Sequence, residues 1–368
     1  MAPSAIYDTP VQLHDGAALE AISDAVDEVN VLKAMAAAKK ARMFPSASPA
    51  PSPAPATAPP SSDEKKSPSS TPATSSPPQS TREEEEEEKV FDAQSEFDSA
   101  KDKTTFRQYE SACDRVKSFY TEQHAKQTVA YNLAARQRFH SASRIRPELT
   151  VWEAIEKLNT LVDESDPDTS LSQIQHLLQS AEAIRRDGKP RWMQLTGLIH
   201  DLGKLMLFFD GAEGQWDVVG DTFPVGCAFD DKCIYPDTFA ANPDYGHEVY
   251  GTEFGIYGPP GGPGCGIGNL MMSWGHDEYL YLVMRDQSTL PQEALAMIRY
   301  HSFYPWHTEG AYMRFMAPGD EVLLNAVRAF NPYDLYSKSD APLDVESLKV
   351  SLLPRVPGCD GEIFCADN

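Results

Sequence analysis

A long segment of low complexity restricts where this chain can build a hydrophobic core. Residues 45–81 consist almost entirely of Pro, Ser, Ala and Thr, and a run of glutamates from Glu83 to Glu88 follows them. Such segments cannot bury enough apolar surface to offset the conformational entropy lost on folding. We therefore predict a disordered N-terminal arm over residues 1–98 and one folded domain over residues 99–368.

The arm contains one segment with a helical pattern. Leu19, Ile22, Val26 and Val29 recur at spacings of three and four residues, which fits an amphipathic helix. Two interpretations stay open for this segment. It is either a marginal helix without a contact surface or an element through which the arm binds an unknown partner.

Composition excludes several classes of partner. The chain of 368 residues carries 55 acidic and 32 basic side chains, a formal charge of −23, and this charge repels nucleic acid and anionic membranes. It lacks an apolar run of about 18 residues and the pattern of a secretory signal. Its six cysteines form no C-x-x-C pair and fit reduced thiols. We expect a cytoplasmic, monomeric protein that binds neither nucleic acid nor membrane.

Helical periodicity dominates the predicted domain, and alternation typical of strands is scarce. The glycine-rich stretch at 253–270 lacks the strand–loop–helix context of a phosphate-binding loop. The predicted fold class is therefore mostly α, in a single domain. We expect helices at roughly 107–142, 150–161, 169–187, 191–209, 245–256, 276–287, 291–301, 319–329 and 344–350.

The segment LIHDLGKLM, residues 198–206, places polar side chains where apolar ones predominate. His200 and Asp201 are adjacent, and Lys204 follows one helical turn after the histidine. A buried carboxylate and ammonium need compensating partners, and a metal ion bound by His200 and Asp201 is the first candidate.

His176 precedes this segment, in an amphipathic segment of its own. One histidine on an apolar face is more often a hydrogen-bonded core residue. The order of His176, His200–Asp201 and a distant aspartate, however, is the pattern of the HD superfamily, whose helices converge on a divalent metal.

Six longer segments carry a more specific resemblance. In chain order they are LVDESDPDTS, LTGLIHDLGK, VVGDTFPVGC, MMSWGHDEYLY, MIRYHSFYPWHTEGAY and NPYDLYSK. They resemble segments of the myo-inositol oxygenase family, from about Thr105 to Lys338. The resemblance implies an HD-domain-like helical domain around a non-haem di-iron site. It also implies cleavage of the C1–C6 bond of myo-inositol, with O2 as co-substrate, to give D-glucuronate and water.

The resemblance implies a mixed-valent Fe(II)/Fe(III) centre in which one aspartate bridges two iron ions. Imidazole nitrogen and carboxylate oxygen suit iron, and few protein ligands leave positions open for substrate and oxygen. It does not extend to Asp277, His247 or His307 as ligands, and we expect Asp277 to be a supporting carboxylate. The implied ligands are His176, His200, Asp201 and Asp334 for one iron, and the bridging Asp201 with His276 and His301 for the other.

The resemblance also implies a polyol site. Lys204 and Asp201 are the expected catalytic residues, with Lys204 as a hydrogen-bond partner or base for a substrate hydroxyl. From the residues alone, DESDPD is a helix-capping acidic loop and GD is a turn, and these alternatives stay open. The implied substrate contacts are Arg107, Asp163, Ser165, Lys204, Gly220, Asp221, His301, Ser302 and Lys338.

Two other functions compete with the oxygenase. An HD-type metal-dependent phosphohydrolase would need basic side chains for phosphate, and it leaves His276 and His301 without a clear role. A metal-free scaffold that recruits partners through its arm is the second alternative. All six implied ligand positions hold residues competent to bind metal, which argues against the scaffold. The tail after Lys338 and the glycine-rich loop depart from the family pattern.

Overall fold

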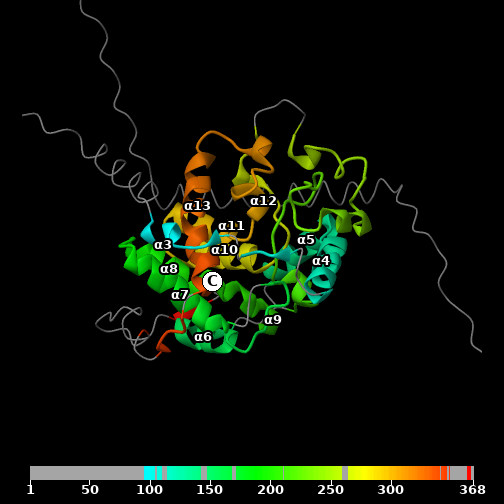
Figure 1. Ribbon diagram of the computed structural model, residues 1–368. Coiled ribbons are helices and arrows are strands. Elements are labelled where there is room, and N and C mark those ends of the chain that lie inside the picture. The colour runs from blue at the N-terminus through cyan, green and yellow to red at the C-terminus, as the bar shows by residue number, and fades with distance from the viewer. Residues whose placement is uncertain are drawn as a thin grey trace, which may run out of the picture. The chain divides into compact units, whose positions relative to one another are not determined.

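The computed structural model describes residues 95–103, 106–109, 114–141, 147–167, 171–209, 211–258, 264–339, 341–345, 348 and 363–365. The predicted arm up to residue 94 and its amphipathic segment lie outside them. The described part is mostly helical, so the predicted fold class is confirmed (Figure 1). Its α-helices are α3 (Glu96–Ser99), α4 (Asp114–Lys126), α5 (Val129–Phe139), α6 (Val151–Leu158), α7 (Gln173–Arg186), α8 (Arg191–Ile199), α9 (Met206–Phe209), α10 (His276–Gln287), α11 (Gln292–Tyr300), α12 (Tyr304–His307) and α13 (Asp320–Tyr336).

Short elements connect these helices. Strands β1 (Glu148–Thr150) and β2 (Ile363–Cys365) pair antiparallel, with Leu149 opposite Phe364, a pairing that sequence periodicity did not predict. None of the helices in the described ranges is long and apolar enough to cross a lipid bilayer. The 3-10 helices are η3 (Leu202–Leu205), η4 (Gln215–Asp217), η5 (Pro236–Ala241), η6 (Gly255–Tyr257), η7 (Ile267–Asn269), η8 (Met313–Phe315) and η9 (Ser337–Ser339).

Two helix pairs and α13 build the part of the fold that matters for the site. Helix α7 packs on α8, α10 packs on α11, and both pairs contact each other and α13 (Figure 1). A short connection joins the helices of each pair, so they run antiparallel. The start of the first helix and the end of the second therefore lie at the same end of the bundle. Apolar faces with helical spacing hold the bundle together, as Leu177, Ala181 and Ile184 of α7 are fully buried.

The predicted helix over 191–209 breaks after Ile199, and a tight turn of η3 follows. Gly203 in this turn lets η3 lie directly against the start of α10. A Cβ atom at Gly203 would stand only 2.1 Å from the carbonyl oxygen of His276. Only glycine permits this approach.

Two other helix predictions were wrong in extent. The single helix expected over 107–142 is two helices separated at Gln127 and Thr128. Thr128 caps α5 by accepting a hydrogen bond from the Tyr131 amide, and the Gln127 side chain bonds to both backbone groups of Trp274. Helix α13 runs past the predicted end at residue 329 and includes Asp334.

The helix expected over 245–256 does not form, and this segment folds as turns that end in η6. The Asn242 side chain accepts a local hydrogen bond from the Asp244 amide, which favours a turn over a helix. The Asp244 carboxylate accepts a long-range hydrogen bond from the Val129 amide at the start of α5. Gly246 and Gly255 adopt φ values of +76° and +54° that interrupt helical geometry. The helix expected over 344–350 lies mostly outside the described residues. The predicted domain boundary between residues 98 and 99 falls within α3. This boundary stays a prediction.

His124 of α4 is a buried histidine unrelated to the predicted ligands. Its ring stacks on Phe239 at 3.7 Å between centroids, and its Nδ1 lies 2.6 Å from the Thr238 hydroxyl. Burial disfavours the charged imidazolium and lowers the pKa of His124 from 6.5 to about 3.

This burial predicts a pH dependence of stability. The pKa of His124 is lower in the folded state than in the unfolded state. Neutral His124 therefore contributes its full stabilisation of the fold above about pH 6.5, and this contribution is lost as the pH falls toward about 3. His124→Phe removes the titrating group. Between about pH 7.5 and about pH 5.5, the free energy of unfolding of the native chain should therefore drop by about 1.4 kcal/mol more than that of the variant. Urea unfolding at both pH values measures this, and parallel curves would contradict the assignment.

Candidate metal centre and substrate pocket

The six predicted ligands lie together at one end of the helix bundle. His176 lies in the first turn of α7, His200 and Asp201 follow the last residue of α8, and His276 begins α10. The antiparallel pairing of the helices explains why residues so far apart in sequence meet. His301 directly follows α11, Asp334 lies in the last turn of α13, and all six side chains are buried, at 0–7% exposure.

Asp334 joins the first pair of histidines. Its Oδ1 lies 3.1 Å from Nε2 of His176 and 3.2 Å from Nε2 of His200. These donor atoms are close enough to share one cation. Nε2 of His200 is buried and makes no hydrogen bond to any of the described residues, which leaves its lone pair available for a metal ion.

Asp201 directs its two oxygens to different histidine pairs. Oδ2 lies 3.6 Å from Nε2 of His176 and 3.8 Å from Nε2 of His200. Oδ1 lies 3.4 Å from Nε2 of His276 and 3.6 Å from Nε2 of His301. This is the disposition that a carboxylate bridging two cations needs.

Backbone carbonyls orient three of the imidazoles. The Nδ1 atoms of His200, His276 and His301 lie 2.9, 2.7 and 3.0 Å from the carbonyl oxygens of Gly197, Val218 and Ile298. A proton on each Nδ1 leaves Nε2 as the ligating atom. Nε2 of His276 is 3.1 Å from Nε2 of His301, so two lone pairs would repel each other unless a cation or proton lay between them. The donor set therefore fits metal ions.

The charge around His276 supports the same conclusion. Burial opposes a positive charge on this ring, yet the nearby carboxylates of Asp277 and Asp201 outweigh burial and raise the pKa of His276 to about 10. These carboxylates require a positive partner at the Nε2 position. A metal ion can take the place of the proton there.

Asp277, which the sequence predicts to be a supporting carboxylate, lies in direct contact with one of the predicted metal ligands. It is 1% exposed, and its Oδ1 stands 2.7 Å from Nε2 of His276. It also accepts hydrogen bonds from the amide and the hydroxyl of Ser302, at 3.1 and 3.0 Å. His307 is buried and directs Nε2 to the carbonyl of His301, whereas His247 is exposed. Neither of these two histidines joins a cluster with metal-site geometry among the described residues.

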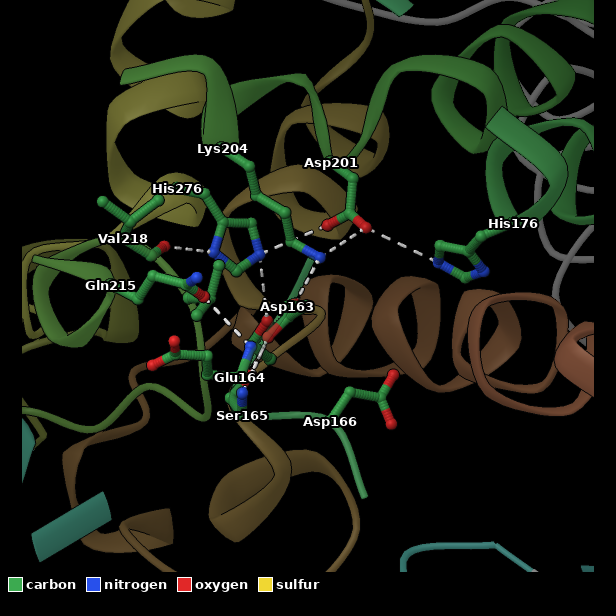
Figure 2. A network of polar contacts seen from close by, with 12 residues as sticks. Asp163, Glu164, Ser165, Asp166, His176, Asp201, Lys204, Gln215, Val218 and His276 are labelled. Carbon is green, nitrogen blue, oxygen red and sulfur yellow. Dashed lines mark hydrogen bonds and ion pairs between the residues drawn. The ribbon is translucent and has the colours of Figure 1, made fainter. Parts of the chain in front are cut away.

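Lys204 connects the metal cluster to the acidic loop of the DESDPD motif. Its Nζ donates to Oδ2 of Asp201 at 2.8 Å and to Oδ2 of Asp163 at 2.9 Å (Figure 2). Burial lowers the pKa of Lys204, but the two carboxylates outweigh burial and raise it above its ordinary value. Asp163 Oδ1 accepts from the amide and the hydroxyl of Ser165.

A second ion pair lines the same pocket. Arg107, at a φ of +57°, donates to both oxygens of Asp221 at 3.2 and 2.6 Å and lies 3.5 Å above the ring of Tyr304. The Tyr120 hydroxyl also bonds Asp221 Oδ1. A third pair joins Lys338 to Asp166 at 2.6 Å.

One pocket is lined by every predicted site residue except His200. The sequence did not predict three aromatic residues, two loop residues and one α13 residue of this pocket, although SFY lay inside one of the motifs that it singled out. Those six are Tyr109, Tyr120, Tyr304, Asp166, Pro167 and Leu335, and the predicted lining residues are Arg107, Asp163, Ser165, His176, Asp201, Lys204, Gly220, Asp221, His276, His301, Ser302, Asp334 and Lys338.

Comparisons with known proteins agree with the resemblance seen in the motifs. The family model of myo-inositol oxygenase matches residues 113–353. A probable inositol oxygenase of Oryza sativa subsp. japonica is 49% identical over 250 residues, which cover 66% of this chain and 79% of the relative. The inositol oxygenase of Dictyostelium discoideum is 47% identical over 258 residues, covering 69% and 87%. That of Mus musculus is 46% identical over 255 residues, covering 68% and 87%.

The position of Asp201 predicts different effects for two carboxylate substitutions. Asp201→Ala should abolish binding of both metal ions, because each histidine pair loses its shared oxygen donor. Asp334→Ala should weaken mainly the ion held with His176 and His200. Elemental analysis of metal-loaded, desalted protein measures this, with circular dichroism as the control for folding. Full metal content in the Asp201 variant would exclude a bridging role.

Proposed function

The chain belongs to the myo-inositol oxygenase family, and we propose that it cleaves the C1–C6 bond of myo-inositol with O2 at a di-iron centre, giving D-glucuronate and water. The observation that carries the proposal is the geometry of Asp201, which turns one oxygen toward each histidine pair. Such a carboxylate can hold two cations at a fixed separation.

The protein residues divide the work of holding the metal. We assign one ion to His176, His200 and Asp334, and the other to His276 and His301, with Asp201 shared between them. When bound, a mixed-valent iron pair would supply the Lewis acidity and the redox capacity for a four-electron oxidation by O2. Few protein ligands per ion leave positions open for substrate and oxygen.

The remaining pocket residues suit an uncharged polyol. Lys204 and Arg107 offer donors, whereas Asp163 and Asp221 offer acceptors, and their ion pairs hold each group in a fixed direction. Fixed donors and acceptors around a ring of hydroxyls would orient one carbon–carbon bond toward the metal centre. Gly220, Ser165, Ser302 and Lys338 complete the proposed contacts. Burial of these walls limits the access of water.

We assign Lys204 the role of a proton-holding group. It donates to Asp201 at the metal centre and to Asp163 at the substrate side, so its ammonium can also donate to a substrate oxygen bound between them. These two carboxylates keep the proton on Nζ. The geometry favours a hydrogen-bond donor over the alternative role of general base.

The charge of the pocket disfavours the phosphohydrolase alternative. Asp163, Asp166, Asp201, Asp221 and Asp334 line it against three basic side chains. Each of these basic side chains already pairs with at least one of the carboxylates. A phosphate group would therefore have to compete with these carboxylates for the basic side chains.

The first prediction from this function concerns stoichiometry. The iron-loaded protein should consume O2 with myo-inositol and form glucuronate in equal amounts, without added reductant, because all four electrons come from the substrate. An oxygen electrode together with a glucuronate assay measures both. Release of phosphate from a panel of nucleotides, without O2 uptake, would support the hydrolase instead.

A second prediction separates metal binding from substrate handling. Lys204→Met should keep the metal content, because Nζ is not a ligand. It should lower kcat by about 10²- to 10⁴-fold, the range typical of a lost proton-handling group. Elemental analysis and steady-state kinetics test the two parts. Loss of metal in this variant would show that Lys204 supports the ligands rather than the substrate.

A further inference from the structure

One side chain outside the pocket fixes the loop that carries Asp163. We propose that Gln215 is a positioning residue, whose side-chain amide holds the backbone on both sides of Asp163 and so sets the direction of that carboxylate. The inference rests on the proposed function, because it concerns how the substrate-binding wall is held.

The contacts of Gln215 are complementary to the loop. Its Oε1 accepts from the amide of Glu164 at 3.0 Å (Figure 2). Its Nε2 donates to the carbonyl of Val162 at 2.9 Å. The amide side chain thus imitates the edge of a neighbouring strand and bonds to the residues before and after Asp163. Arg115 gives the loop one further bond, from Nη1 to the carbonyl of Asp163 at 3.3 Å.

The loop has little apolar packing to replace these bonds. Val162 is 77% exposed and Glu164 is exposed, whereas Asp163 between them is only 8% exposed. The position of the Asp163 backbone therefore depends on these hydrogen bonds, whereas Ser165 and Lys204 contact its carboxylate directly. Because Asp163 in turn pairs with Lys204 at 2.9 Å, a displaced loop would also release one partner of Lys204.

The turn that contains Gln215 also orients a proposed metal ligand. The carbonyl of Gln215 accepts from the amides of Val218 and Val219, both at 3.0 Å. The carbonyl of Val218 then accepts from the amide of His276 at 2.8 Å and faces its Nδ1 at 2.7 Å (Figure 2). One turn thus sets Asp163 through a side chain and His276 through a carbonyl. Gln215 consequently fixes the polyol-binding wall relative to the metal centre.

Gln215→Met tests this role, because methionine has a similar length and makes neither hydrogen bond. The chain offers a matched control in Gln175, which bonds to both backbone groups of Leu343, at 3.0 and 2.8 Å. Gln175→Met removes the same two kinds of hydrogen bond from a segment that does not line the pocket. Gln215→Glu keeps the acceptor for the Glu164 amide and loses the donor to Val162.

The kinetic expectation is a split between KM and kcat. Gln215→Met should raise KM for myo-inositol about tenfold with a smaller change in kcat. A tenfold loss of affinity lies within the range expected when two hydrogen bonds are removed. Metal content and Tm should stay near those of the native chain. Gln215→Glu should be intermediate, and Gln175→Met should leave KM unchanged. A loss of Tm in Gln215→Met with an unchanged KM would mean that the residue is only structural, and would overturn the proposal.

A double-variant cycle tests whether Gln215 acts through Asp163. In an Asp163→Asn background, Gln215→Met should change KM by less than about twofold, because Gln215 affects substrate binding through the Asp163 carboxylate, which this background lacks. A tenfold effect that persists in this background would overturn the assignment.

Hydrogen exchange supplies a test that does not need turnover. The Glu164 amide should exchange faster in Gln215→Met than in the native chain, and Gln175→Met should not change it. Equal exchange rates would overturn the anchoring itself. An inactive native enzyme whose exchange is altered as expected would contradict the proposed function and leave the anchoring intact.

Discussion

The rest of the site depends on the attraction between the buried carboxylate of Asp201 and its positively charged partners. At 3% exposure it could not stay ionised without positive partners, and burial would raise its pKa. The attraction of Lys204 and the surrounding imidazoles outweighs burial, and the pKa of Asp201 falls well below its ordinary value. The two antiparallel helix pairs bring those partners to one point. The fold thus stabilises a charge whose burial in the surrounding apolar segment would otherwise be unfavourable.

Sequence reasoning succeeded where polar residues interrupted a strong apolar pattern. His200, Asp201 and Lys204 stood out for this reason, and α7, α10 and α11 followed from their periodicity. It failed where a long-range contact overrode local preference. The break between α4 and α5 reflects Gln127, whose side chain bonds to Trp274 at a distance of 147 residues along the chain. Turn-forming side chains and glycines likewise overruled the helical spacing at 245–256.

The supporting residues of the site were less accessible to sequence than its proposed ligands. Motif resemblance assigned the metal and polyol residues, and all of these residues except His200 line one pocket. It gave no reason to select Gln215, which lies 51 residues from Glu164 and carries no charge. Nor did it predict how closely Asp277 approaches His276. Such roles depend on which backbone groups a side chain reaches, and spacing along one sequence does not contain that information.

The arrangement of the bundle has a consequence for how the chain can change during evolution. All proposed ligands lie at one end of the two helix pairs, so the connection at 288–291 between α10 and α11 lies at the other. Thr289 in this connection is exposed. Lengthening a surface connection costs little free energy, because loop-closure entropy grows only slowly with length. Insertions there would leave the register of His276 and His301 intact, so sequence drift can accumulate far from the chemistry.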